Sequence, residues 1–306
     1  MKLARRAISG VLLANKPAGI SSTSAVGWAK RLFNAAKAGH TGTLDPFATG
    51  LLPICFGEAA KFARFHLDAD KRYLATLKLG ERSSTGDTEG EIVESRSVEC
   101  TEIDAESVLA AKIGAQRQTP PMHSAIKVDG VPLYKLARKG LETERAERAI
   151  EIFSLKLAAW SPPWITVDAH VSKGTYIRVL AEDIGAALGC GAHLVKLERI
   201  ASGSLNLAKA TTFDELEAMS LEDRDALLLP PGALADALPR LGLSDSDASA
   251  FCNGRPVRLQ AFKATGLHRI HNSAGRFLGV AQVCDEGSDR VVVPERLMSP
   301  DLRESD

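Results

Sequence analysis

The chain has 306 residues, of which 45% are hydrophobic and 25% charged, and its 38 basic side chains balance its 38 acidic ones. This is the composition of an ordinary folded protein, and it excludes a largely disordered or collagen-like chain. The length allows one large domain or two. No apolar run approaches the roughly 18 residues that a membrane helix needs, so we expect no membrane association.

The cysteines and the first residues of the chain indicate in which cellular compartment the protein works. The five cysteines are scattered and form no Cys-x-x-Cys pair. This pattern is typical of free or buried thiols in a reducing environment. The apolar stretch after Arg6 resembles a secretory signal only weakly, because Ser9 and Gly10 interrupt it. We therefore expect a cytoplasmic protein.

The front of the chain carries only positive charge. Residues 1–44 contain seven Lys and Arg residues and no Asp or Glu. Such a segment can bind a polyanion even when the whole chain is neutral, or it can form solvated helix faces. Charge alone does not choose between these two interpretations.

The first elements are a short strand, a helix and a shaped loop. Residues 11–14 read as a buried strand. Ser21, Ser22 or Thr23 can cap a helix whose apolar stripe is Val26, Ala29, Phe33 and Ala36. Residues 38–46 are too rich in Gly and Thr for a helix and are expected to form a loop. It ends at Asp45, which precedes a proline and is therefore biased away from helical dihedral angles.

Two strands and a second helix follow. Apolar residues alternate with polar ones over residues 73–79 and again over 165–171, as in half-buried strands. The turn at 172–174 leads into a helix with an apolar stripe of Ile177, Leu180, Ala181 and Ile184. The elements lack a regular βαβ rhythm, so the sequence predicts an α+β fold with a mixed, largely antiparallel sheet.

Two further segments differ in character. Residues from about 117 to 149 carry a net positive charge and no sustained apolar stripe, which indicates an insertion on the surface. Prolines and small residues between 227 and 239 resemble a linker. Short apolar runs with Gly turns follow, and they predict a small β-rich domain. We therefore expect one domain over residues 1–236 and a second over residues 237–306.

Common cofactor and metal motifs are missing. The sequence has no Walker loop, no Gly-x-Gly-x-x-Gly loop, no His-Glu-x-x-His and no EF-hand pattern. His268 and His271 could share a metal, but no cysteine cluster supports them. The sequence therefore predicts a protein without metal or cofactor.

The loop at 39–52 is the first candidate for chemistry. Its glycines allow backbone to pass close to a ligand, and Pro46 restricts the backbone at Asp45. A carboxylate in a partly apolar wall can act as nucleophile or base. A basic residue such as Arg178, at a junction between strand and helix, can pair with it, and a tyrosine can stack on a base. Taken alone, an Asp-Pro turn is more often structural, a tyrosine can belong to the core, and a basic residue can form a surface ion pair.

Taken together, the motifs resemble the TruB family of tRNA pseudouridine-55 synthases. The resemblance rests on an ordered set of motifs that spans about residues 10–205. The motifs are Asn15-Lys16-Pro17, Gly39-His40-Thr41-Gly42-Thr43-Leu44-Asp45-Pro46, Lys71-Arg72-Tyr73 through Gly80 and then Asp87 to Gly90, Pro120-Pro121-Met122-His123-Ser124-Ala125-Ile126-Lys127, Ser172 to Arg178, and Gly191 to Arg199. It implies a pseudouridine synthase catalytic domain with a thumb insertion, and the C-terminal part resembles a PUA-like domain loosely.

The resemblance also implies roles for individual residues. Asp45 would be the nucleophile, Arg178 would hold its carboxylate, and Tyr73 would pack on the target uracil. The remaining assignments concern the substrate: Tyr176 and Leu197 would line the uridine pocket, Lys16 would support it, His40 would sit against the T-loop, and Lys127 would contact phosphates. His123 stands where many members carry an aromatic residue such as tyrosine.

The implied function is isomerisation of uridine 55 in the T-arm of tRNA by a stand-alone, monomeric enzyme with no protein partner. Attack at uracil C6, attack at ribose C1′ and elimination to a glycal remain open. A glycosidase that uses Asp45 needs a second carboxylate, and a non-catalytic RNA-binding module needs none. Guide-RNA-dependent synthases of the dyskerin type share these motifs, but the basic thumb and small C-terminal domain favour the stand-alone bacterial type.

Overall fold

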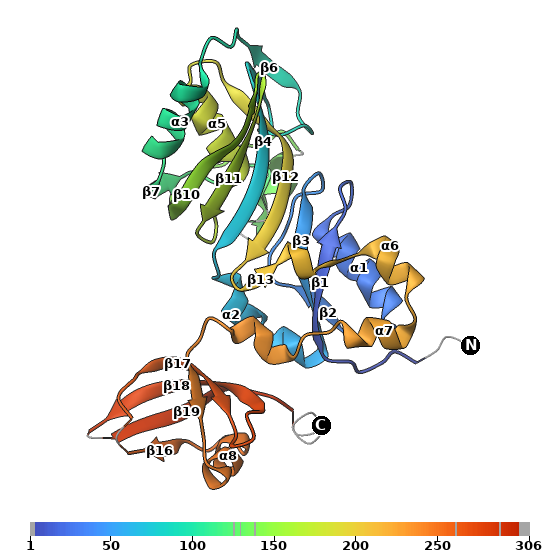
Figure 1. The fold of residues 1–306 in the computed structure, drawn as a ribbon, viewed down its shortest axis with the longest axis vertical. Coiled ribbons are helices and arrows are strands. Elements are labelled where there is room, and N and C mark those ends of the chain that lie inside the picture. The colour runs from blue at the N-terminus through green and yellow to red at the C-terminus, as the bar shows by residue number, and fades with distance from the viewer. Residues whose placement is uncertain are drawn as a thin grey trace.

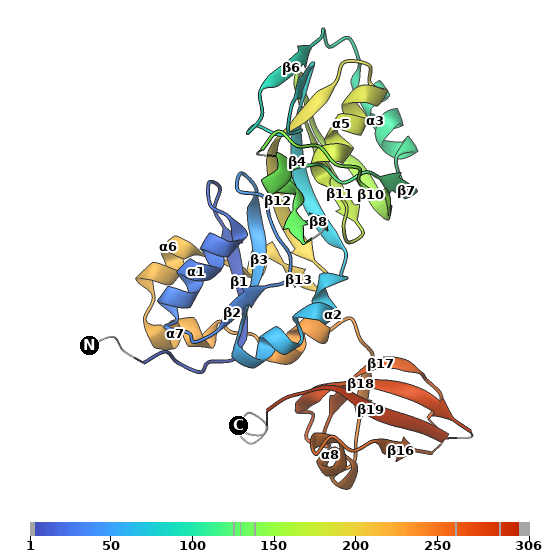
Figure 2. The same cartoon turned by 180° about the vertical axis from the view of Figure 1, so that it is seen from behind.

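The computed structural model describes residues 4–124, 126–128, 130–137, 139–260, 262–287 and 289–299. The molecule is elongated, with one large sheet and, at one end, a smaller C-terminal sheet (Figure 1). The same arrangement is seen from behind in Figure 2. The candidate site lies in the large sheet, and the strands and helices around it hold its side chains in place.

The large sheet has ten strands. Its main path runs β14-β1-β3-β12-β4-β11-β10-β7, while β2 pairs with β3 and β13 with β12. The strands are β1 (Gly10–Lys16), β2 (Ala38–His40), β3 (Thr49–Phe56), β4 (Lys71–Leu79), β7 (Gly114–Gln118), β10 (Arg148–Ser161), β11 (Trp164–Val171), β12 (Ala192–Ser202), β13 (Leu205–Asn206) and β14 (Thr211–Thr212).

Most neighbours in this sheet are antiparallel. Among the described strands of this sheet, only the β1–β14 and β3–β12 pairs are parallel. The expectation of an α+β fold with a mixed, largely antiparallel sheet is confirmed. The expected strands at 73–79 and 165–171 are β4 and β11, and they pair in register with Tyr73 opposite Ala169. Residues 38–40, expected in a loop, instead form β2, because their backbone pairs with β3.

Helices α1 (Ser22–Leu32), α3 (Glu102–Ala111) and α5 (Ile177–Ala187) contribute to the main hydrophobic core of the sheet. Helix α1 begins where the sequence predicted, because the Ser21 side chain accepts a hydrogen bond from the Ser24 amide. Helices α6 (Phe213–Ala218) and α7 (Leu221–Ala226) lie beside α1 (Figure 1). The apolar stripe predicted after residue 176 is the buried face of α5.

Two glycines allow close approaches that shape the site. Gly50 has φ +98°, and a Cβ there would lie 2.5 Å from the carbonyl oxygen of Arg199 on the paired strand. A Cβ at Gly185 would lie 2.1 Å from the Ala192 nitrogen. Both distances are far below van der Waals contact, so only glycine lets β3 and α5 pack this tightly on β12.

Residues 119–147 lie between β7 and β10, and we call them the thumb insertion. They contain β8 (Lys127–Val128), β9 (Val131–Pro132) and α4 (Leu133–Ala137). Their two ends are brought together because β7 and β10 are antiparallel, with Gln118 opposite Arg148. A short hairpin of β5 (Glu81–Ser83) and β6 (Ile92–Ser95) lies after β4.

The C-terminal sheet has the order β15-β17-β18-β19-β16. Its strands are β15 (Arg240–Gly242), β16 (Val257–Leu259), β17 (Gly266–His271), β18 (Phe277–Glu286) and β19 (Asp289–Leu297), with α8 (Asp245–Cys252) against them. The expected β-rich character is confirmed, whereas α8 and β17 were not anticipated.

Short helices join the two parts of the molecule. They are η1 (Gly57–Lys61), α2 (Ala63–Leu67) and η3 (Pro231–Ala235), and an apolar cluster that includes Phe62, Leu234 and Val280 spans the junction. Residues 227–239, expected as a linker, are thus partly helical and packed. No helix among the described residues has the length and apolar character to cross a membrane.

Candidate active site

A cavity of about 380 Å³ opens in the large sheet, of the size that accepts a small ligand. Asp45, from the loop between β2 and β3, and Arg178, from the first turn of α5, share this cavity with Tyr73 of β4. Its other lining residues are Gly42, Thr43, Leu44, Leu67, Lys71, Ser124, Ile126, Ser172, Gly174, Thr175, Tyr176, Ile177, Leu197 and Arg199. Residues 133 positions apart in sequence are therefore brought together here.

Asp45 and Arg178 form a two-point ion pair. The Nε of Arg178 lies 3.0 Å from Oδ2 of Asp45, and Nη2 donates to Oδ1 at 3.3 Å. The Arg178 side chain is 5% exposed, whereas that of Asp45 is 34% exposed. The forked guanidinium fixes the plane of the carboxylate, and the carboxylate remains open to the cavity.

Arg178 is itself fixed from behind. Its Nη1 lies 3.4 Å from Oδ2 of Asp87, a carboxylate that is 2% exposed. Its Nη1 also donates to the carbonyl of Thr85 at 3.3 Å, and its Nη2 donates to the carbonyl of His123 at 2.7 Å. The hydroxyl of Thr85 donates to Oδ1 of Asp87 at 2.5 Å. Asp87 does not line the cavity; it holds Arg178 from behind, and its negative charge also acts to raise the pKa of Asp45.

The loop that carries Asp45 is held by two buried cations. Nζ of Lys16 donates to the carbonyls of Pro17, Ile20 and Pro46, at 2.8, 2.8 and 3.2 Å. The guanidinium of Arg199 donates to three more backbone carbonyls: Leu51 at 2.7 Å, Gly42 at 3.2 Å and Thr43 at 3.4 Å. Lys16 is 0% and Arg199 2% exposed, so neither cation is free to meet solvent.

The electrostatic environment follows from this burial. Desolvation raises the pKa of the Asp45 carboxyl, although Arg178 acts to lower it. A carboxylate that is partly desolvated is more basic than one in water, which suits a nucleophile or base. Burial lowers the pKa of Lys16 and of the cavity residue Lys71 to about 8 in each case. Burial also raises the pKa of the Tyr176 phenol.

The structure does not bring every predicted residue into the cavity. Tyr73, Tyr176 and Leu197 line it, whereas Lys16 lies beneath the Asp45 loop. His40 ends β2, and its Nδ1 accepts a hydrogen bond from the Gly42 amide at 3.2 Å. Burial lowers the pKa of His40, which favours the neutral imidazole.

The thumb residue Lys127 was expected to contact phosphates. It lies in β8, and its side chain is outside what the structure describes.

Sequence reasoning overlooked Asp87 and the role of Arg199. Asp87 lies between Gly86 and Thr88 in a turn-rich segment, where an aspartate is ordinarily a turn residue. The only signal in the sequence was its place in a motif after β4. Arg199 ends another motif, and its three carbonyl partners are 148 to 157 residues away, so no local pattern reveals them.

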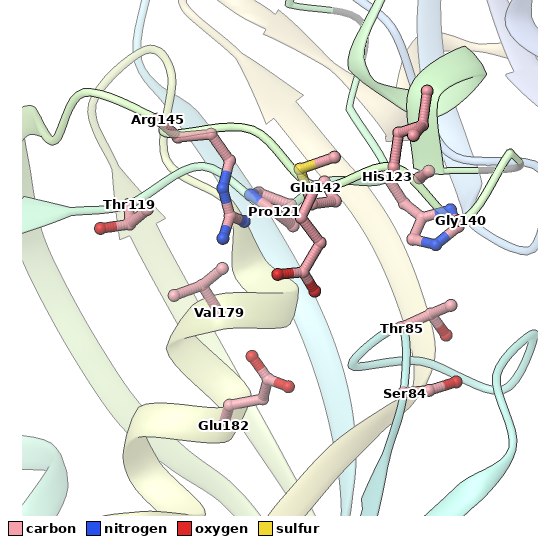
Figure 3. Close-up of a pocket in the computed structure, with 13 residues that line it drawn as sticks. Ser84, Thr85, Thr119, Pro121, His123, Gly140, Glu142, Arg145, Val179 and Glu182 are labelled. Atoms are coloured by element: carbon pink, nitrogen blue, oxygen red, sulfur yellow. The ribbon is translucent and has the colours of Figure 1, made fainter.

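A second cavity, of about 500 Å³, is lined by residues 121–123 together with residues of α5. Figure 3 shows Thr119, Pro121 and His123 of the thumb insertion above Val179 and Glu182 of α5. Arg145 comes from the returning arm of the insertion, and its Nη1 donates to the Pro120 carbonyl at 3.0 Å. The thumb insertion therefore meets α5 directly beside Arg178.

Family models match three consecutive parts of the chain. Residues 30–177 match the N-terminal domain of the TruB family pseudouridylate synthases. Residues 178–235 match the tRNA pseudouridylate synthase B C-terminal domain, and residues 239–298 match the C-terminal model of pseudouridine synthase II TruB.

Curated relatives and solved structures agree with these matches. The chain is 50% identical to the tRNA pseudouridine synthase B of Thiobacillus denitrificans, over 98% of this chain and 99% of the relative. It is 47% identical to that of Burkholderia mallei, over 97% of this chain and 96% of the relative. The fold is similar to a chain of the Cbf5-Nop10-Gar1 complex, with a TM-score of 0.74 and 24% identity over 95% of this chain and 86% of that one. The chain thus belongs to the TruB family of pseudouridylate synthases.

Proposed function

We propose that this protein isomerises uridine to pseudouridine at position 55 in the T-loop of tRNA, with Asp45 as the nucleophile. The observation that carries the proposal is the ion pair of Asp45 with the buried Arg178, beside Tyr73, in a cavity of about 380 Å³. The names of the relatives, tRNA pseudouridine synthase B, support tRNA as the substrate.

The arrangement suits a reaction in which a base is detached and reattached. The glycosidic C–N bond breaks and a C–C bond forms between the same sugar and base, so the base must stay bound while it turns. Tyr73, Tyr176 and Leu197 offer aromatic and apolar walls that hold a uracil through its faces. The target uridine must leave the stacked T-loop to enter, at a cost of a few kcal/mol.

The residues divide this work between them. Arg178 aims the Asp45 carboxylate, while Lys16 and Arg199 fix the loop behind it. Tyr73 packs on the uracil and is placed to assist a proton transfer. We propose that His40 meets the T-loop and that Lys127 contacts phosphate. No metal or cofactor is assigned to these steps.

A glycosidase is the alternative that uses the same nucleophile. It needs a second carboxylate facing the substrate as acid. The nearest second carboxylate, Asp87, is buried behind Arg178, and its Oδ1 accepts hydrogen bonds from Thr85 and from the Glu89 amide. It is poorly placed to protonate a substrate, and this favours isomerisation over hydrolysis.

The test uses unmodified tRNA transcript and the full chain. We expect pseudouridine at a single T-loop uridine, no release of free uracil, and no product with Asp45→Asn. Free uracil as the main product would instead indicate a glycosidase, and intact uridine with tight tRNA binding would indicate an RNA-binding protein. We further propose that the enzyme is cytoplasmic. We also propose that it acts as a monomer without a protein partner. Light scattering with and without tRNA measures its molar mass and so tests the oligomeric state.

A further inference from the structure

The side chain of Gln118 pairs with the backbone of Tyr176. Its Oε1 accepts a hydrogen bond from the Tyr176 amide at 2.8 Å, and its Nε2 donates to the Tyr176 carbonyl at 3.1 Å. Gln118 is 4% exposed, so these bonds form away from water. A buried amide that satisfies both backbone groups of one residue fixes that residue in space.

Tyr176 is the residue at which α5 begins. It is the N-cap of α5, and no side chain on the helix's own segment caps this end. Gln118, on a distant strand, instead holds the N-cap residue itself, because its oxygen accepts the hydrogen bond of the Tyr176 amide. Arg178 is two residues further along, in the first turn of α5. The position of the Arg178 backbone therefore depends on the anchoring of Tyr176.

Gln118 is also the point at which the thumb insertion starts. It is the last residue of β7, opposite Arg148 of β10, and the insertion lies between these two residues. The arm that follows Gln118 carries His123, whose carbonyl accepts a hydrogen bond from Arg178 at 2.7 Å. Figure 3 shows this arm, from Thr119 to His123, running over α5. Gln118 and the arm that follows it thus contact the start of α5 at two points, Tyr176 and Arg178.

We propose that Gln118 is a positioning residue that connects the thumb insertion to Arg178. It acts through Tyr176 and Arg178 and does not touch the substrate. Through its hydrogen bonds to Tyr176, and together with the His123 carbonyl, Gln118 holds Arg178 where it aims Asp45. The inference rests on the proposed function, since its readout is pseudouridine formation.

The first test replaces Gln118 by methionine, which keeps the length and removes both hydrogen bonds. The matched control is Gln116→Met on the same strand, where the side-chain amide bonds to the Lys112 carbonyl at the end of α3 and not to Tyr176. We expect the single-turnover rate at saturating tRNA to fall about thirtyfold in Gln118→Met, with the tRNA Kd changed less than about threefold. The control should keep its rate within about twofold.

The second test is Gln118→Glu, measured across pH. A protonated glutamic acid can accept from the Tyr176 amide and donate to its carbonyl, as glutamine does. An ionised one faces the Tyr176 carbonyl with a negative charge and no donor. We expect the ratio of variant to wild-type rate to rise about fivefold or more from pH 8.5 to pH 6, because burial raises the pKa of such a carboxyl. A loss of folding alone does not produce this recovery.

The outcomes for the proposed function and for the role of Gln118 can be told apart. Wild-type product at the T-loop uridine tests the proposed function, whereas the variant-to-wild-type ratio tests Gln118. A saturating rate for Gln118→Met within twofold of wild type would overturn the inference. So would a loss confined to Kd, or a Gln118→Glu ratio that does not change with pH while its thermal melt remains cooperative.

Discussion

Lys16 donates a hydrogen bond to the carbonyl of Pro46, the residue that follows Asp45. The ammonium is completely buried and also bonds to the carbonyls of Pro17 and Ile20. Its removal leaves the backbone turn around Asp45 with unpaired carbonyls. We expect Lys16→Met to lower the free energy of unfolding by about 2–4 kcal/mol and to reduce the saturating rate of pseudouridine formation.

Lys37→Met is the matched control for this prediction. Lys37 belongs to the same basic front of the chain, but its side chain is exposed. Chemical denaturation and single-turnover kinetics on both variants measure the difference. Equal stability of the two variants would show that the Lys16 contacts do not hold the loop.

Asp45→Asn is expected to abolish product formation while the protein still binds tRNA. Asparagine keeps the shape of the side chain but cannot act as the nucleophile. The tRNA Kd should change by no more than about tenfold, or about 1.4 kcal/mol, because Asp45 is one small group in a large interface. Filter binding and pseudouridine mapping on the same preparation provide both readouts. A near wild-type rate would remove Asp45 from the mechanism.

Asp87→Asn tests the support behind Arg178. The substitution removes a buried negative charge that lies 3.4 Å from Nη1 of Arg178. Loss of one partner from a buried ion pair commonly costs about 3–5 kcal/mol. We expect lower stability and a lower saturating rate, with little change in tRNA Kd. Asp183→Asn, a half-buried carboxylate on the same helix as Arg178, should leave the rate unchanged.

The raised pKa of Asp45 predicts how activity and stability depend on pH. Activity needs the ionised carboxylate, so it should fall as the pH drops through this raised pKa, above the ordinary aspartate range. Between the ordinary and the raised value the native state binds more protons than the unfolded state, so stability falls as the pH rises through this window.

It follows that Asp45→Asn should be more stable than wild type at pH 7, and that this difference should disappear at pH values below the window. Arg178 does not become an unpaired charge in this variant, since Asp87 and the carbonyls of His123 and Thr85 remain. Thermal melts of both proteins at several pH values test the prediction. A variant that is less stable at pH 7 would show that the ion pair, and not desolvation, dominates.

The sequence predicted those residues of the site that belong to a local pattern or to a motif. Asp45 stood out because glycines and a proline surround it, and the Ser21 cap and apolar stripes located α1 and α5. The contacts of Arg199 and Gln118 could not be predicted, because each joins segments 58 or more residues apart in sequence. Residues 38–40 were misjudged because Gly and, to a lesser degree, Ala are depleted in strands, and pairing with β3 overrides that preference.

The last prediction concerns the thumb insertion, where Lys135 and Lys139 are exposed. If each cation contacts one phosphate, its loss should make the slope of log K against log salt shallower by about 0.9 for duplex-like RNA and somewhat less for single strands. Lys135→Ala/Lys139→Ala should therefore bind tRNA more weakly, with a shallower salt dependence, while the rate at saturating tRNA falls much less. The control is Lys112→Ala/Lys156→Ala, two lysines outside the insertion. Equal slopes of log K against log salt for wild type and the thumb variant would mean that these lysines are solvent-exposed surface residues that do not contact phosphate.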